Sequence, residues 1–433
     1  MRYTLLKCVV ESLRSQAQGD RVMALEEPTE RLSIWDEYPY LDNVTADFRN
    51  GGFPTNINPF PQASSAPRLN MQASHSAQAI IIDGCEHPHV FVGTEHNLGE
   101  YELNGTKRDN PIEVLDVIYR YSGMRFGPHG QFPQATIIYR DLTTKEISFF
   151  HLNRFTRGAD DFGFLNKWEN FNQLKAGAII TPETVLSTSP AHIGPAYCLG
   201  TNLSTAYITF PDVIEDAMLI SESAAKKMTS TQVSRVVING KPDMRFLNLY
   251  GDEDDYRIIP NIGDVVREDG LLCGLRPTDS KTFAADVDPK SLREVRDMQD
   301  TLYTIKPGSI VADIEVFINQ NQTKHPYLQI DQYQDGAIAY WRAVWQAYVR
   351  LVKNVPIKPK ISKTFNTLID TAILRLVAMK ASPIPKMAKA KPDLEGLNGQ
   401  PVDYIQIVIT YIAKRKVQKG FKLSNRYGGL TIR

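Results

Sequence analysis

The chain has 433 residues, 42% of them hydrophobic and 23% charged, which is the composition of an ordinary globular protein of two or three domains. Lysine plus arginine and aspartate plus glutamate both number 49, so the formal net charge is zero, and attraction to a polyanion through bulk charge is excluded. The four cysteines form no CxxC pair and no apolar run reaches membrane-spanning length, which excludes a disulfide scaffold and favours a soluble, intracellular protein.

The first part of the chain is expected to consist of extended turns, because residues 33–76 are rich in Pro, Asn, Gly and Ser. Turn segments of this kind expose backbone and side chains to ligands. Arg68 stands in this polar loop, and its planar guanidinium suits a bidentate grip on phosphate oxygens. Taken alone, such an arginine is more often a surface residue in a structured turn.

A β-rich body is predicted to follow, from short stretches in which apolar and polar residues alternate. These stretches are residues 79–82, 90–93, 135–139, 147–151 and 206–210. A small hairpin unit is expected over residues 258–276, where Gly263 and Asp264 have the composition of a turn.

Two adjacent carboxylates, Glu215 and Asp216, precede an apolar run at 217–220 that is expected to be a buried strand. Ser221 is expected to cap a short helix over residues 222–227. Neighbouring residues of a strand point to opposite faces, so the two carboxylates cannot easily both ligate one metal ion directly. One of them could face a substrate-bound Mg²⁺ through water, and the alternative is a solvated acidic turn.

Two helices are predicted in the last third of the chain. Residues 337–353 carry apolar side chains at helical spacing, and a second helix is expected over residues 364–380. Trp341 and Trp345 are expected to pack against a core rather than to stack on bases, because their spacing matches one helix face. A strand is predicted at residues 402–411.

A basic segment follows at residues 414–429. Within it, Lys422 and Arg426 lie among small and flexible residues that allow a phosphate backbone to approach closely. Without further context this segment is an ordinary basic surface.

Two other motifs are interpreted as surface loops. Residues 85–89 contain a cysteine and two histidines, but no second Cys or His pair is near in sequence to complete a zinc site. Residues 251–256 contain four acidic side chains and are expected to form an exposed acidic turn.

In this order and together, three motifs resemble the second-largest, beta-type subunit of multisubunit DNA-directed RNA polymerases. Residues 60–79 are similar to the family's loop whose arginine meets the phosphates of the incoming nucleotide. Residues 196–222 are similar to its Glu-Asp-Ala signature, and residues 416–429 resemble its lysine signature. The resemblance implies an α+β, β-rich fold with a partial double-psi β-barrel and a wall or flap insertion, which would begin near residue 261.

The resemblance also implies roles for individual residues. Arg68 would contact the triphosphate, and Lys422 would contact the RNA end or the nucleotide. Arg426 matches the arginine of the lysine signature and is expected to bind nucleotide or RNA. Glu215 and Asp216 would be outer-sphere partners of a nucleotide-borne Mg²⁺.

Three positions depart from the family's lysine signature. Phe421 stands where the family has aspartate, Tyr427 where it has histidine, and Leu430 where a second lysine belongs. The resemblance therefore implies one active-centre lysine in this chain, Lys422, instead of two.

The family pattern divides the chain into four segments. They are 1–78, a fork- or lobe-like segment with the nucleotide-contacting loop; 79–235, a β-rich barrel half with the Glu-Asp motif; 236–410, a wall- or flap-like insertion; and 411–433, the start of the lysine signature returning to the barrel. The chain stops shortly after this signature, where the family continues, and in this it resembles the split beta subunits of giant bacteriophages.

The reaction implied is template-directed nucleotidyl transfer with two metal ions, in which this chain supplies cations that neutralise charge on the triphosphate. The sequence has no Asp-x-Asp-Gly-Asp triad, so Mg²⁺ would be held mainly by a beta-prime-like partner subunit, and the chain is not expected to be active alone. Further expected partners are a chain carrying the rest of beta, template DNA, nascent RNA and nucleoside triphosphates, with no membrane. The expected location is the infected bacterial cell, and packaging in the virion is left open.

Two alternatives stay open from the sequence. The first is a non-catalytic, beta-like module retained for assembly of a polymerase complex, which the missing second lysine favours. The second is a chain that is truncated or joined to further sequence, because an active-site signature lies so close to its end.

Overall fold

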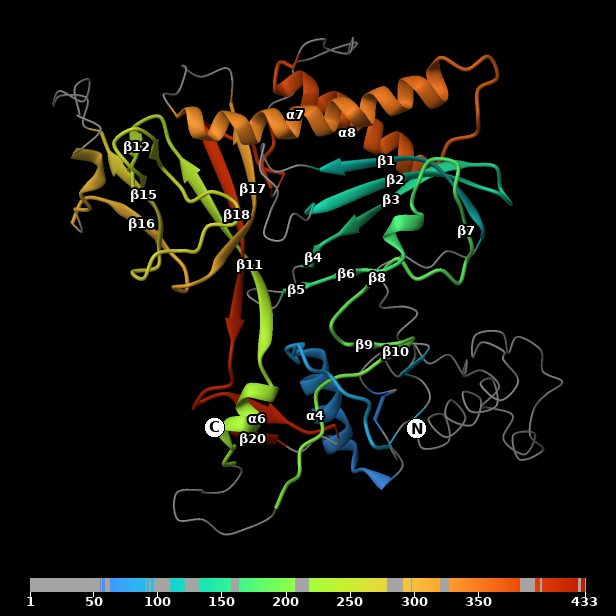
Figure 1. Ribbon diagram of the computed structural model, residues 1–433, viewed down its shortest axis with the longest axis vertical. Helices are drawn as coiled ribbons and strands as arrows, with labels where there is room; N and C mark the ends of the chain where they lie inside the picture. Colours follow the sequence, from blue (N-terminus) through green and yellow to red (C-terminus); the bar gives the residue numbers. More distant parts are fainter. Residues whose placement is uncertain are drawn as a thin grey trace. The chain divides into compact units, whose positions relative to one another are not determined.

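Figure 1 shows the computed structural model of the chain. It describes residues 55, 57–58, 63–90, 92, 95–96, 110–120, 132–156, 163–206, 218–278, 291–296, 298–319, 327–381, 394–397, 399–426 and 430–432. The chain forms two compact units. Unit 1 comprises Met1–Gly105, Thr188–Thr231 and Arg415–Arg433, and unit 2 comprises Thr106–Ser187 and Gln232–Lys414.

The described residues form a mixed α and β structure that is rich in strands, which confirms the β-rich expectation at that level. The four predicted segments were defined by resemblance to sequence motifs, whereas the two units are defined by contacts between residues in the folded chain. The segments therefore stay a prediction.

The strands of unit 2 are β1 (Ile112–Arg120), β2 (Gln134–Asp141), β3 (Ile147–Asn153), β4 (Phe155–Thr156), β5 (Phe164–Leu165), β6 (Lys167–Trp168), β7 (Ile179–Ile180), β12 (Met244–Phe246), β13 (Tyr250–Gly251), β14 (Tyr256–Arg257), β15 (Leu271–Pro277), β16 (Thr301–Thr304) and β17 (Ile310–Ile318). Its helices are η7 (Phe171–Gln173), η9 (Ser291–Arg293), α7 (Leu328–Tyr348), the π-helical turn η10 (Val349–Lys353) and α8 (Lys363–Ala378).

The elements of unit 1 are α4 (Ala66–Ala77), β9 (His192–Ile193), β10 (Ala196–Tyr197), α6 (Glu222–Lys227), β19 (Lys422–Ser424) and β20 (Leu430–Ile432). Three strands include residues of both units, namely β8 (Ser187–Thr188), β11 (Ser230–Gly240) and β18 (Ile405–Arg415).

An antiparallel sheet of order β3-β2-β1-β7 separates two apolar clusters of unit 2. Alternate residues of a strand face opposite sides. On β2, Ala135 and Ile137 accordingly belong to a cluster on one face, and Ile138 belongs to a second cluster that contains residues of α7 and α8. Thr136 points to the same face as Ile138, since its hydroxyl lies 2.8 Å from the Tyr340 hydroxyl on α7.

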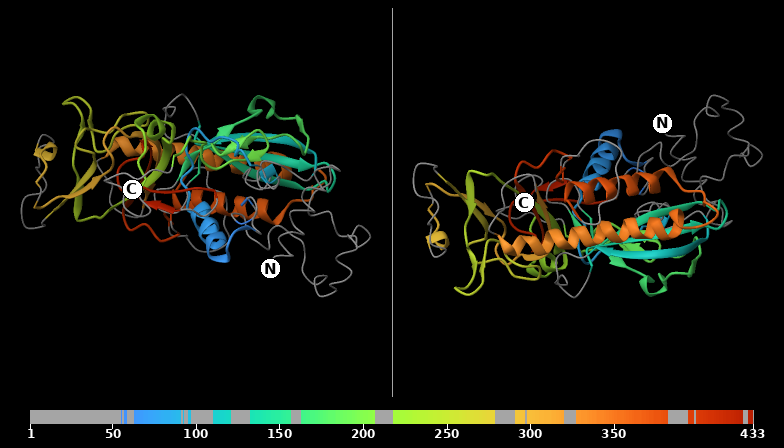
Figure 2. Two further views of the ribbon diagram at one scale, coloured as in Figure 1. Left: turned by 90° about the horizontal axis from the view of Figure 1, so that it is seen from below. Right: turned by 90° about the horizontal axis from the view of Figure 1, so that it is seen from above.

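Helices α7 and α8 lie side by side over this sheet (Figure 2). The α7 side chains Tyr340, Val344 and Ala347 are spaced by three and four residues and are all buried, as the helical pattern requires. Ser362 caps α8 by accepting a hydrogen bond from the Phe365 amide at 3.0 Å. Both predicted helices are therefore confirmed, although α7 begins at Leu328 and not at residue 337. The helix capped by Ser221 and the strand at 402–411, which lies largely in β18, are confirmed as well.

Two three-stranded sheets, β11-β18-β17 and β12-β15-β16, share the largest apolar cluster of the chain. Strands of this region form a curled sheet with the form of half a barrel. The first turn of α7 contributes Ile330, which is fully buried in the same cluster.

Three local predictions are wrong. No hairpin forms within residues 258–276, because β15 pairs with β12 and β16 instead. Residues 79–82 are not a strand. The run at 217–220 is not a buried strand where the structure describes it, since Met218 is 37% and Leu219 53% exposed. The strands predicted at 135–139 and 147–151 are confirmed in β2 and β3, whereas residues 90–93 and 206–210 lie partly outside the described residues.

Within the described parts of the chain, the helices are all too short or too polar to cross a membrane.

Candidate functional site

The segment that carries Arg68 is a helix and not the polar loop expected from its composition. Pro67 stands at the start of α4, where a missing N–H costs no hydrogen bond, and Ser65 precedes it in an extended conformation. The helix then continues through residues with good helical propensity, among them Leu69 and Met71. Arg68 is exposed in its first turn, and its Nη1 lies 3.7 Å from the sulfur of Met71.

Lys422 lies in the same unit and is exposed on β19, which pairs with β20. The pKa of His75, at the other end of α4, is lowered by burial and, next, by the positive charge of Lys422. The charge of Lys422 therefore acts at the C-terminal end of the helix that carries Arg68. A rise of 1.5 Å per residue puts Arg68 and His75 about 10 Å apart along the helix axis.

Arg426 is half-buried and holds together segments that are far apart in sequence. Its Nε and Nη2 donate to the Leu199 carbonyl at 3.1 and 2.9 Å, and its Nη1 donates to the Asn202 side-chain oxygen at 2.9 Å. A longer contact of 3.4 Å joins Nη2 to the Glu86 carbonyl. Gly200 adopts a φ of +76° between these acceptors, which a residue with a side chain rarely does.

Three further side chains complete what we call the Arg426 hub, defined as Glu86, Asn202, Lys227 and Arg426. The Glu86 carboxylate accepts hydrogen bonds from the backbone amide of Asn202 at 2.8 Å and from Lys227 Nζ at 2.7 Å. Asn202 also donates to the His87 carbonyl at 2.7 Å, and Lys227 donates to the Asn202 carbonyl at 3.1 Å. The hydrogen bond from Lys227, helped by that from Asn202, lowers the pKa of Glu86 to about 2.

The hub has a consequence for the predicted role of Arg426. All three guanidinium nitrogens of Arg426 already donate hydrogen bonds within the chain, so this arginine holds residues 199–202 and residue 86 in place. Arg68 and Lys422, by contrast, are exposed. The predicted contacts of all three with nucleotide or RNA stay predictions.

Glu215 and Asp216, expected beside a nucleotide-borne Mg²⁺, lie outside the described residues, as does Tyr427. Phe421, which stands where the family has aspartate, lies under the Arg415 guanidinium at 4.8 Å from ring centre to carbon. Leu430 begins β20 and pairs with Ser424.

The motif at residues 85–89 lies in a loop, as expected. The fold nevertheless brings Cys198 to this loop, with its sulfur 3.3 Å from His87 Nδ1. Burial raises the pKa of the Cys198 thiol to about 11 and also raises that of Cys85, so neither is a reactive thiolate near neutral pH. Among the residues that the structure describes, no three His, Cys, Asp or Glu side chains are placed to hold a metal ion.

Reasoning from the sequence missed Glu86 and Lys227 as partners of the lysine signature. Neither carries a local signal, because Glu86 lies in a loop and Lys227 occupies the last turn of a short helix, where a lysine is common. Asn202 was within a segment singled out by resemblance, but its bonding to Arg426 spans 224 residues and has no sequence pattern.

No protein-family model matches this chain, and a search of the curated proteins found no similar sequence.

Proposed function

We propose that this chain is a beta-type subunit, corresponding to the C-terminal portion of beta, of a multisubunit DNA-directed RNA polymerase that transcribes phage genes. The observation that carries the proposal is the Arg426 hub. Its arginine comes from the lysine signature, and it binds Leu199 and Asn202 of the second polymerase-like signature. Two motifs chosen from the sequence for one active centre thus contact each other directly.

The motif at residues 60–79, which carries Arg68, supports the same proposal. Arg68 and Lys422 belong to one compact unit, and Lys422 is close enough to α4 to perturb His75. In the proposed reaction the RNA 3′ oxygen attacks the α-phosphorus of a nucleotide and pyrophosphate leaves. Arg68 and Lys422 would neutralise negative charge on the phosphates, which is the main contribution that side chains make to phosphoryl transfer.

The proposal includes a division of labour over the metal ions. Mg²⁺ would be held mainly by a beta-prime-like partner, because the sequence has no Asp-x-Asp-Gly-Asp motif. Glu215 and Asp216 would act on the nucleotide-borne ion through water. The finer fold in the proposal is a partial double-psi β-barrel with a wall or flap insertion, and the strand-rich, curled sheet is compatible with it.

One observation favours a second candidate, a beta-like module that serves assembly alone. The guanidinium of Arg426 is committed to the chain's own backbone and side chains, and Leu430 stands where a second lysine is expected. Such a module would bind the same partner subunits without contributing to chemistry.

Substitution of Lys422 distinguishes the two candidates. The chain would be purified with its partner subunits, and elongation on a primed template would be compared for Lys422→Ala, Lys419→Ala and the native chain. Both lysines are exposed and lie in the same segment. Loss of one transition-state cation should slow elongation by about a hundredfold in Lys422→Ala and leave Lys419→Ala near the native rate.

Recovery of the partner subunits with both variants shows that assembly is intact. A native elongation rate in Lys422→Ala would refute the catalytic proposal and leave the assembly module. Purification without any subunit that carries an acidic metal triad would refute both.

A further inference from the structure

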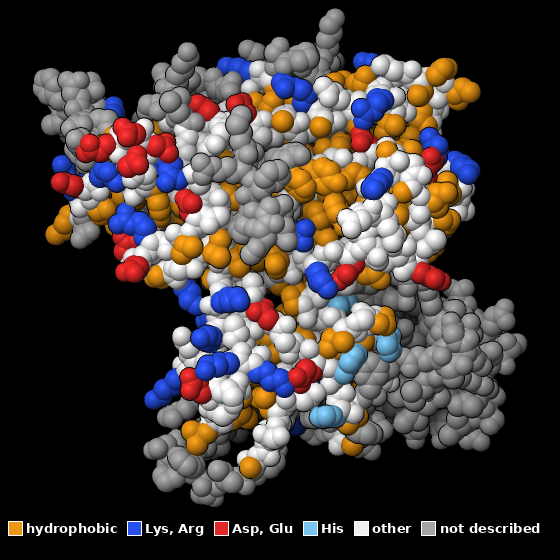
Figure 3. Space-filling view, viewed as in Figure 1, with side chains coloured by type: hydrophobic (Ala, Val, Ile, Leu, Met, Phe, Trp, Pro, Cys, Tyr) orange, Lys and Arg blue, Asp and Glu red, His pale blue; other side chains and the backbone are white. Residues whose placement is uncertain are grey.

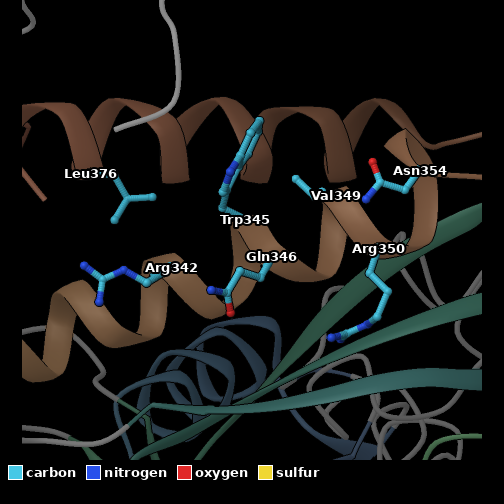
Figure 4. A pocket seen from close by; sticks show the side chains of 7 residues that line it. All are labelled: Arg342, Trp345, Gln346, Val349, Arg350, Asn354 and Leu376. Atoms are coloured by element: carbon cyan, nitrogen blue, oxygen red, sulfur yellow. The ribbon is translucent and has the colours of Figure 1, made fainter. Parts of the chain in front are cut away.

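A pocket of about 330 Å³ lies along α7, its π-helical end and α8 in unit 2 (Figure 4). Its lining residues are Arg342, Trp345, Gln346, Val349, Arg350, Asn354 and Leu376. The α7 side chains project from successive turns, and Leu376 faces them from α8 (Figure 4). The pocket thus combines an indole, two guanidinium groups and two amides, and we call it the α7–α8 groove.

The chain around this groove is strongly basic although the whole chain is neutral. Residues 336–369 contain six Lys or Arg side chains and no Asp or Glu. Figure 3 shows basic side chains spread among exposed apolar ones over the α7–α8 part of unit 2. In a chain of zero net charge, a segment without one acidic residue is a local excess of positive charge along the sequence, and such an excess favours anionic partners.

Only part of this charge is offset within the chain. Arg350 forms an ion pair with Asp116, and Lys360 lies 3.7 Å from Glu146. Lys358 and Lys363 are exposed, and no described carboxylate pairs with either. Lys363 opens α8, where the helix dipole disfavours a cation, and the first turn of α8 has no acidic residue. Helix stability therefore does not explain the lysine at that position.

Trp345 gives the groove a flat aromatic wall. The centre of its ring lies 5.5 Å from that of Tyr348, and Lys353 Nζ lies over the ring at 5.7 Å from its centre, where an incoming base would displace it. Its other contacts belong to the apolar cluster between sheet and helices, so the packing expected from the sequence holds for part of the ring. The π-helical turn that follows is a rare local structure, and such turns occur frequently at functional sites.

We propose that the α7–α8 groove binds single-stranded nucleic acid, with one base at Trp345 and the adjoining phosphates at Lys358 and Lys363. These two lysines follow the lining residue Asn354 along the chain, and we call them the basic track. Stacking on an aromatic ring beside a basic track is the usual way in which proteins hold single strands without reading their sequence. The side-chain amides of Gln346 and Asn354 can donate to and accept hydrogen bonds from base edges. The inference stands on unit 2 alone and does not depend on the proposed polymerase function.

The basic track is tested by charge reversal in the full chain. Binding of a fluorescent single-stranded RNA oligonucleotide would be measured by anisotropy for Lys358→Glu/Lys363→Glu and for the matched control Lys175→Glu/Lys241→Glu. Both pairs are exposed lysines of unit 2, and both changes alter the net charge equally. We expect at least a tenfold loss of affinity and a fall of about 1.4 in the logarithmic salt slope for the first pair, and native values for the second.

The aromatic wall is tested by Trp345→Leu, with Trp341→Leu as the control for loss of a packed indole in the same helix. Trp345→Leu should weaken RNA binding about tenfold or more and leave binding of inorganic polyphosphate unchanged, because only the RNA offers bases. Circular dichroism and thermal melting establish that each variant is folded.

The results of these experiments distinguish single-stranded nucleic acid from other anionic ligands of the groove. Equal effects of the two lysine pairs, equal effects of the two tryptophan variants, or RNA binding no tighter than polyphosphate binding would overturn the proposal. Polyglutamate that competes as well as RNA would assign the groove to an acidic protein and also overturn it. A parallel titration with single-stranded DNA tells whether RNA is preferred, and either result supports a single-strand site.

Discussion

In unit 2, segments far apart in sequence meet through large clusters of buried apolar side chains, whereas in unit 1 the Arg426 hub joins such segments through hydrogen bonds. The largest cluster of unit 2 runs from Ile238 to Ile409. The cluster described in unit 1 has two buried members, Ala191 and Tyr197, with a few half-buried neighbours. Apolar packing depends on volume, and a polar hub depends on donor geometry and protonation. The two units should therefore respond to different substitutions.

The largest expected effect is a cavity in unit 2. Phe365 is fully buried between α8 and the sheet. Phe365→Ala should lower the free energy of unfolding of unit 2 by about 3–5 kcal/mol, because transfer and cavity terms add. Denaturant titration measures the loss, and Asn366→Ala, an exposed neighbour on the same helix, should stay within about 0.5 kcal/mol. A loss below about 1 kcal/mol would mean that this core is not closely packed.

A conservative exchange should be enough to disturb unit 1. Arg426→Lys keeps the charge but replaces three donor nitrogens in one plane by a single one, and we expect a loss of about 1–3 kcal/mol in the stability of unit 1. Faster hydrogen exchange at the Asn202 amide, which donates to Glu86, would report the opened hub. Lys419→Arg serves as the control in the same segment. Unchanged exchange in Arg426→Lys would show that the arginine does not hold these segments together.

A smaller effect should appear in the pH dependence of unit 2. Burial lowers the pKa of His151 from 6.5 to about 4, and its Nδ1 lies 2.9 Å from the Thr136 hydroxyl. The unfolded chain then binds more protons between these values, so the contribution of His151 to stability is complete above pH 6.5 and falls as the pH drops toward 4. His151→Asn, which keeps a polar atom near the Nδ1 position, should flatten this slope in thermal melts. A slope that persists in the variant would contradict the assignment to His151.

The smallest effect is expected at Glu86. Its pKa is about 2 in the folded chain against an ordinary 4.5, so its contribution to unit 1 is complete above pH 4.5 and is lost as the pH falls toward 2. Glu86→Gln should reduce the loss of stability in that window, measured by denaturation at stepped pH. Glu222→Gln is the control, because Glu222 is a more exposed carboxylate of the same unit. If Glu86→Gln and Glu222→Gln lost the same stability between pH 4.5 and 2, the low pKa would not belong to Glu86.

Elements with strong local patterns could be predicted from the sequence. Helices α7 and α8 follow from apolar spacing, and α6 follows from its serine cap. Strands β2 and β3 follow from alternating apolar residues. In each case the spacing of apolar residues decides which face of the helix or strand is buried, whichever part of the chain packs against it.

Elements with mixed signals could not be predicted. The segment around Arg68 was interpreted as a loop from its Pro, Asn and Ser content, yet Pro67 begins a helix there. The apolar run at 217–220 had the composition of a buried strand, but Leu219 is exposed. Local composition does not tell whether another part of the chain covers an apolar side chain, and tertiary contacts override it.

The sequence by itself determined the kinds of side chain available, including Arg426, the acid-free run at 336–369 and the zero net charge that makes this run a local feature. Only the tertiary structure decided that Arg426 would donate to Leu199 and Asn202, and that Trp345 of α7 would line a pocket together with Leu376 of α8. The physical reason is that charge and helical periodicity are properties of neighbours along the chain. Hydrogen-bond partners and pockets depend on segments that lie hundreds of residues apart and meet only after folding.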